Sequence, residues 1–170
     1  DLGHKYDHPP ALQPRHRSLA RLIIWWTERC PGVRILLSKL DVDAAFKRVW
    51  LEPEGVGAFA TEYPADLLAR PGTFVHLSLP LNFGWVGSPG EYTPFGQATK
   101  EVFESRAPPQ PEWHDDVPFA DKTLVDDKCL VEPDLGVRPQ HAFCWAELAT
   151  CMIFGSGAVN QAKKLEEGPF

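Results

Sequence analysis

The sequence predicts an α+β fold in which helices pack on one face of an antiparallel sheet. Segments with the pattern of β-strands occur in neighbouring pairs, as hairpins require, and helical segments separate these pairs. Seventeen prolines argue for several loops and against a helical bundle. With 170 residues, of which 44% are hydrophobic, the chain is long enough for one domain with a sizeable core.

The first third of the chain predicts a helix and then a buried strand. Residues 1–17 are rich in proline, histidine and arginine and predict an irregular lead-in. Residues 18–29 carry apolar side chains at helical spacing, and Ser18 can cap this helix. Residues 33–42 predict a strand that ends in Asp41, and Asp43 can cap a following helix. A carboxylate at the end of a buried strand stands where functional sites of α/β proteins usually lie.

The middle of the chain predicts a hairpin, a loop and a long helix. Residues 57–63 and 73–79 have the composition of two strands. Residues 80–90 form a loop rich in glycine and proline, which can bring the backbone close to a phosphate or a nucleotide sugar. Ser88 and Glu91 stand at the spacing of a capping box, which predicts a helix that continues to about Arg106.

The last third predicts a second hairpin and a last helix. Residues 107–121 form a loop rich in proline, and the hairpin 123–131 follows with Asp126 and Asp127 at its tip. A helix is expected from Arg138 to Phe154. Its expected inward residues are Ala142, Trp145, Leu148, Ala149 and Met152.

The charge pattern favours cation binding over direct contact with phosphates. The formal net charge is −6, which in isolation disfavours a nucleic-acid binder. Residues 112–134 hold eight acids against the bases Lys122 and Lys128. These acids are Glu112, Asp115, Asp116, Asp121, Asp126, Asp127, Glu132 and Asp134. Such an excess suits a bound cation or a solvated loop.

Two adjacent carboxylates at a hairpin tip repel each other unless a cation offsets their charge. Mg²⁺, which prefers oxygen ligands, would do so. The alternative is a solvated acidic turn, because aspartate favours turns in any case. If the strand that ends at Asp41 neighbours this hairpin, the carboxylates of Asp41, Asp126 and Asp127 converge.

Four segments in order resemble the motifs of a reverse transcriptase palm of the retrotransposon type. They are Lys39–Phe46, Leu79–Pro89, Leu124–Asp127 and Asn160–Lys163. The resemblance covers residues 33–170, with 1–32 as a lead-in and helix of partial fingers or palm. It implies a polymerase palm, possibly of a DIRS-like element, without the thumb and ribonuclease H domains, and hence a fragment of a larger polypeptide.

The resemblance also implies the site. Asp41, Asp126 and, more weakly, Asp127 would bind two Mg²⁺ ions, or Mn²⁺, together with the backbone of Val42. Lys163 would act near the nucleotide phosphates. Substrate-binding positions would be Phe46, Phe83, Gly84, Trp85, Gly87 and Ser88. The implied partners are an RNA or DNA template with its primer, a dNTP and the remaining polyprotein domains.

Departures from the family pattern leave other functions open. Leu124 replaces the usual aromatic residue before the aspartate pair, and the loop 80–83 is longer than the common form. One alternative is a metal-dependent nuclease or phosphatase that uses the same carboxylates, with His114 activating water. Another is an inactive or co-opted retroelement remnant. The four cysteines lack metal-site spacing, and neither a membrane span nor a signal peptide is expected, so we predict an intracellular protein in the cytoplasm or nucleus.

Overall fold

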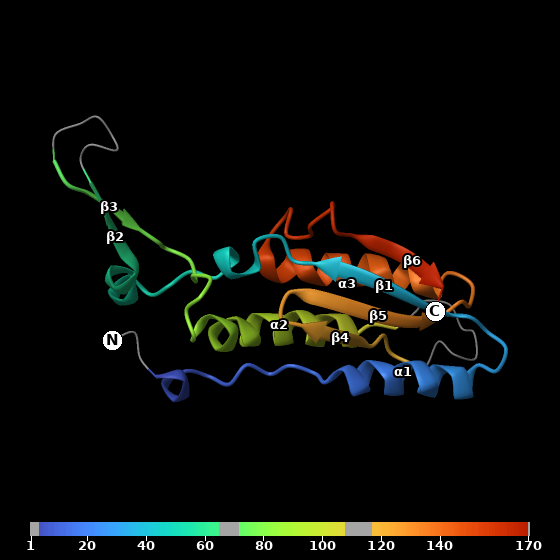
Figure 1. The fold of residues 1–170 in the computed structure, drawn as a ribbon. Coiled ribbons are helices and arrows are strands. Elements are labelled where there is room, and N and C mark those ends of the chain that lie inside the picture. The colour runs from blue at the N-terminus through green and yellow to red at the C-terminus, as the bar shows by residue number, and fades with distance from the viewer. Residues whose placement is uncertain (1–3, 65–71, 108–116, 170) are drawn as a thin grey trace.

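The computed structural model describes residues 4–64, 72–107 and 117–169 (Figure 1). The α-helices are α1 (His16–Arg29), α2 (Ser88–Glu104) and α3 (Arg138–Phe154). The strands are β1 (Ile35–Asp41), β2 (Ala60–Tyr63), β3 (Phe74–Leu77), β4 (Asp121–Leu124), β5 (Asp127–Pro133) and β6 (Leu165–Pro169). Short 3-10 helices are η1 (Lys5–Asp7), η2 (Ala45–Arg48) and η3 (Pro53–Phe59). All strand pairs are antiparallel, which confirms the α+β class.

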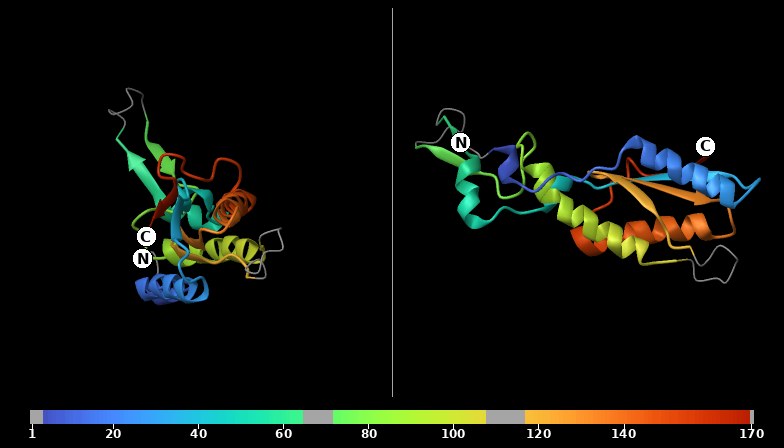
Figure 2. Two further views of the ribbon diagram at one scale, coloured as in Figure 1. Left: turned by 90° about the vertical axis from the view of Figure 1, so that its right-hand side faces the viewer. Right: turned by 90° about the horizontal axis from the view of Figure 1, so that it is seen from below.

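The strands form one four-stranded sheet and one separate hairpin. The larger sheet has the order β4-β5-β1-β6, so the hairpin β4–β5 lies directly beside β1. The register places Leu37 opposite Val131 and Asp41 opposite Asp127. Strands β2 and β3 pair only with each other, and they project from the body of the molecule (Figures 1 and 2).

Helices cover both faces of the larger sheet, so the prediction that they share one face is wrong. Leu130 packs with α2 and α3, whereas the next residue, Val131, packs with Ile23 and Trp26 of α1. Successive residues of a strand point to opposite faces, so α1 lies on the face opposite α2 and α3. The helix α1 runs along the bottom of the view in Figure 1, apart from the other two.

The helix α3 has the predicted bounds, and its buried side agrees in part with the prediction. Leu148 and Met152 were expected to point inward, yet they are 46% and 59% exposed. Ala142 and Ala149 are buried as predicted, Trp145 is partly buried, and Ala146 and Phe143 complete the buried side. Small side chains let a helix approach its neighbours closely, so burial here follows side-chain size more than hydrophobicity.

The N-terminal caps predicted for α1 and α2 differ in the structure. The helix α1 begins at His16 with Arg15 at the N-cap position, so Ser18 lies inside it. Gly87 is the N-cap of α2, and the Ser88 hydroxyl donates to the carbonyl oxygen of Asn82 at 2.6 Å. Serine competes for nearby backbone groups in loops as well as at caps, and here a loop carbonyl is the acceptor.

Other expected elements are shorter than predicted. The helix expected after Asp43 is only the single 3-10 turn η2. The first residues of the predicted strand 57–63 belong to η3, which shortens β2. The acids Glu112, Asp115 and Asp116 and the side chain of His114 lie outside the described residues. No helix in the described ranges is long and apolar enough to cross a bilayer.

A buried ion pair joins α3 to the sheet. The Arg138 Nε atom donates to Glu132 Oε2 at 2.6 Å, and both side chains are at most 3% exposed. The guanidinium also lies over the rings of Trp26 and Phe119, with its carbon 4.8 and 5.3 Å from the ring centroids. Burial raises the pKa of Glu132 to about 7, while the charge of Arg138 opposes this shift.

Candidate active site

The backbone brings the three predicted acids to one end of the sheet. Asp41 is the register partner of Asp127, and the Val42 amide donates to the carbonyl oxygen of Asp126 at 3.1 Å. Side chains of directly opposite residues leave the same face of a sheet with Cβ atoms about 4.5–5.5 Å apart. The predicted adjacency of Asp41 and the hairpin tip is therefore confirmed.

The turn itself differs from the prediction by one residue. Val125 and Asp126 form the turn, and Asp127 is the first residue of β5. Val125 has a φ of +56°, a conformation that is strained for a β-branched side chain. The side chain of Val125 packs against the buried cluster of Val42 and Tyr92. This packing holds the strained turn, and with it the position of Asp126.

Two lysines neutralise the acids that face each other across the strands. The Lys163 Nζ atom lies 3.2 Å from Asp41 Oδ1, and the Lys39 Nζ atom lies 2.8 Å from Asp127 Oδ1. The hydrogen bond to Asp127 raises the pKa of Lys39. Lys39 was not predicted as a site residue. Its place in the sequence could have indicated this role, because Lys39 stands two residues before Asp41 in the same strand, and residues i and i+2 of a strand share a face.

The pKa of the Asp126 carboxyl is raised by its surroundings. Burial raises its pKa above the ordinary value, and the charges of Asp127 and Asp41 raise it further, while Lys163 opposes them. A carboxylate that is costly to ionise among other carboxylates gains most from a bound cation. A divalent ion bound at Asp126 would therefore favour its ionised form.

The segment that carries Lys163 is fastened to the end of β1. The Asn160 amide donates to the carbonyl oxygen of Asp41 at 2.9 Å, and the Lys163 amide donates to that of Asn160 at 3.2 Å. Arg48 donates from Nη2 to the carbonyl oxygen of Gly157 at 2.7 Å and from Nε to that of Asp43 at 2.6 Å. Arg48 thus ties η2 to the segment before Lys163, a role that no sequence motif indicated.

Aromatic side chains border the acids on the side of η2 and the glycine-rich loop. The Phe46 ring contacts Phe83 at a centroid distance of 5.1 Å and Tyr92 at 5.6 Å. Phe83 is 70% exposed, and Gly84 follows it with a φ of +87°, which favours glycine. Phe46 and Phe83, both predicted to bind substrate, therefore form one aromatic surface.

The other predicted substrate-binding residues support the loop. The Trp85 ring packs edge-on against Phe59 and His8, with centroids 5.2 and 4.8 Å away. A Cβ atom at Gly87 would lie 2.6 Å from the Trp85 ring, so a larger residue there would displace the ring. Ser88 is fully buried and uses its hydroxyl within the loop.

The donor atoms at the hairpin suit a hard cation, although the lysines now occupy their vicinity. Within the described ranges, no group of three or more histidine, cysteine, aspartate or glutamate side chains has the geometry of a metal site. The available donors of Asp41, Asp126 and Asp127 are carboxylate oxygens, the ligands that Mg²⁺ prefers. A divalent ion would have to displace the ammonium groups of Lys39 and Lys163 from them.

No protein-family model matches the chain, and no curated protein is similar to it at a significant level. The resemblance to a reverse transcriptase palm therefore stays a prediction.

The raised pKa of Asp126 predicts a pH dependence of stability without divalent ions. A carboxyl whose pKa is higher in the folded state stabilises the fold below its unfolded value, ordinarily 3.8, and this contribution is lost as pH rises through the raised pKa. Asp126→Asn should remove that loss. Urea denaturation of both proteins from about pH 3.5 to 7 measures the difference. If the free energies of unfolding of the two proteins changed with pH in the same way, the raised pKa of Asp126 would be contradicted.

Proposed function

We propose that the chain is the palm part of an RNA-directed DNA polymerase, a reverse transcriptase of a retroelement. The observation that supports this most is the meeting of Asp41 with Asp126 and Asp127 at one end of the β1–β5 pair. These acids come from segments far apart in the chain, with Lys163 on the segment after α3 and Phe46 on η2 near them.

The carboxylates would hold the metal pair. Asp41 and Asp126 would bind two Mg²⁺ or Mn²⁺ ions, with the backbone of Val42 and, more weakly, Asp127. When bound, such ions activate the primer 3′ hydroxyl and neutralise charge on the leaving pyrophosphate. The buried position of Asp41, which is 4% exposed, fixes its carboxylate against the sheet and lowers the reorganisation that binding requires.

Neighbouring side chains would position the nucleotide. Lys163, released from Asp41, would place its ammonium group beside the phosphates and stabilise the negative charge that develops on the leaving group. Phe46, held between Phe83 and Tyr92, would lie under the incoming sugar and exclude a ribose 2′ hydroxyl by its size.

The partners would be an RNA or DNA template with its primer and a dNTP, inside the cell. A net charge of −6 leaves few cations for phosphate contacts on this chain. The basic surfaces that bind the phosphates of nucleic acid would therefore belong to other domains of a larger polypeptide, such as fingers and thumb.

The first test is primer extension by the polypeptide that contains this chain. Asp126→Asn is expected to lower the rate by about 100-fold or more, because even residues that only support metal ligands cost about 10–100-fold. Asp134→Asn is the matched control, since Asp134 pairs with Arg34 at the opposite end of the β1–β5 pair. Normal extension by Asp126→Asn would remove the proposal.

The two alternatives give other results in the same experiment. A metal-dependent nuclease would cleave DNA or RNA with Mg²⁺ and would fail to extend a primer. The nuclease hypothesis also gives no role to the contact of Phe46 with Phe83. An inactive remnant would do neither, while its fold stayed intact by circular dichroism.

A further inference from the structure

The hairpin of β2 and β3 is an exposed element with apolar side chains. Together with the residues that lead into it and follow it, this hairpin forms what we call the hairpin lobe, residues 50–64 and 72–79. Every residue of β2 is exposed, and Val75 and Leu77 of β3 are 56% and 49% exposed. A two-stranded hairpin without a covering layer is at best marginally stable in water. The lobe is therefore expected to gain stability from a surface that covers it.

The described residues of the hairpin lobe carry negative charge and no positive charge. All three of its acids are exposed, and lysine and arginine are absent from these residues. Glu62 stands opposite Val75, and Leu77 is the next residue but one along β3, so these three side chains leave the same face of the hairpin. The lobe therefore presents apolar side chains next to negative charge. The three acids are Glu52, Glu54 and Glu62.

The exposed side of α1 carries the opposite charge. Arg17, Arg21 and Ile24 recur at i, i+4 and i+7, so they lie along one side of the helix. Ile24 is 56% exposed, and Trp25 beside it is 41% exposed. Arg15 at the N-cap adds a third positive charge, and the one acid of α1 lies in its last turn. These five residues, which we call the α1 face, are thus apolar and positively charged.

The hairpin lobe and the α1 face lie at opposite ends of one copy, so a single chain cannot bring them together. The lobe projects at one end, and α1 lies along the far end of the sheet, in two perpendicular views (Figures 1 and 2). Apolar side chains combined with complementary charges are typical of an interface between proteins. A net charge of −6 disfavours a nucleic acid as the partner of the α1 face, and the acids of the lobe would repel its phosphates.

We propose that the hairpin lobe of one copy docks on the α1 face of a second copy of this chain. The three glutamates of the lobe would lie near the three arginines of the α1 face, with the apolar side chains of both surfaces between them. Because the two surfaces differ, each pair of copies keeps one free lobe and one free α1 face, and association continues beyond the dimer. Neither surface includes the acids of the candidate active site, so this association is independent of the polymerase proposal.

The first test is sedimentation equilibrium of the chain without divalent ions or nucleic acid. Between about 10 and 300 µM protein, we expect the average mass to rise above that of one chain, with a Kd of about 100 µM or lower. Raising NaCl from about 0.05 to 0.5 M should weaken the association, because salt screens the charges. A chain that stays monomeric would overturn the proposal, also if its α1 face bound an oligonucleotide. A plateau at two copies would overturn it as well, since it would indicate a symmetric interface.

The second test reverses the charge of each surface in turn. One variant carries Arg17→Glu with Arg21→Glu, and the other carries Glu54→Lys with Glu62→Lys. Each should associate at least tenfold more weakly, because its two surfaces then have the same sign of charge. An equal mixture should associate again, since each surface meets its complement on the other variant. Unchanged association of either variant, or a mixture of folded variants that stays monomeric, would contradict the docking.

Both variants are expected to keep the fold. The four substituted side chains are exposed, and glutamate near the start of α1 interacts favourably with the helix dipole. Circular dichroism and thermal unfolding check this. Glu101→Lys is the control, because it reverses an exposed charge on α2 outside both surfaces and should leave the association unchanged. A loss of association in this control would assign the effect to net charge and overturn the proposal.

Discussion

Replacing Arg138 with methionine is expected to lower the free energy of unfolding by about 3–5 kcal/mol. The guanidinium is 2% exposed, and its loss would leave the carboxylate of Glu132 buried without its partner. The stacking of Arg138 on Trp26 and Phe119 would be lost as well. Urea denaturation at pH 8, where the unpaired Glu132 is most costly, measures the change.

The control is a double variant that removes both charges. Glu132→Leu with Arg138→Met should recover most of the lost stability, because replacing a buried pair by apolar residues of similar volume is often neutral or stabilising. A single variant that unfolds at the same urea concentration as the wild type would show that the pair is not buried as described. A double variant that is no better than the single one would assign the loss to ring stacking.

Replacing Trp26 with alanine is expected to cost about 3–5 kcal/mol. This side chain is fully buried and packs with Ile35 and Val131 on the sheet face that α1 covers. If α1 lay loosely against the sheet, the cost would fall to the value of an exposed residue. The measurement is again urea denaturation, with the m-value as a check on the compactness of the native state.

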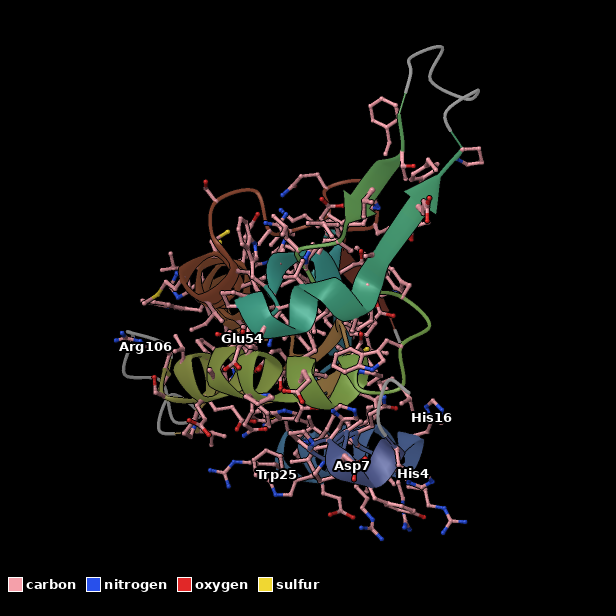
Figure 3. The ribbon with its side chains drawn as sticks, turned by 90° about the vertical axis from the view of Figure 1, so that its left-hand side faces the viewer. His4, Asp7, His16, Trp25, Glu54 and Arg106 are labelled. Carbon is pink, nitrogen blue, oxygen red and sulfur yellow. The ribbon has the colours of Figure 1, made fainter. Side chains whose placement is uncertain are left out.

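The neighbouring tryptophan provides the matched control. Trp25 is 41% exposed, and Figure 3 shows it projecting from α1 at the surface of the molecule. Trp25→Ala should cost less than about 1 kcal/mol, since surface substitutions rarely exceed this. Equal losses at the two positions would contradict the placement of α1.

Much of the fold could be predicted because local patterns decide it. The helix α3 has the expected bounds, since Gly155 with a φ of +89° stops it where the glycines of the sequence indicated. The strand that ends at Asp41 and the acidic hairpin were expected from composition and turn signals. The two segments lie side by side because β1 pairs directly with β5.

The remaining features depend on tertiary contacts that no local pattern encodes. An apolar stripe shows that α1 packs on something, but it does not show which face of the sheet it covers. The lysines on Asp41 and Asp127 depend on the register and on the path of the segment after α3. The burial of Asp121 beside Lys100 and Lys128 likewise depends on the pairing of β4 with β5 and on the packing of α2.

The alternation of Leu130 and Val131 between the two helix layers also governs the acids at the other end of the same strand. A slip of β5 along β1 by one residue would exchange these two side chains between unlike neighbours. The same slip would carry Asp127 away from Asp41. The register of β5 on β1 is therefore fixed twice, once by core packing and once by the grouping of the carboxylates.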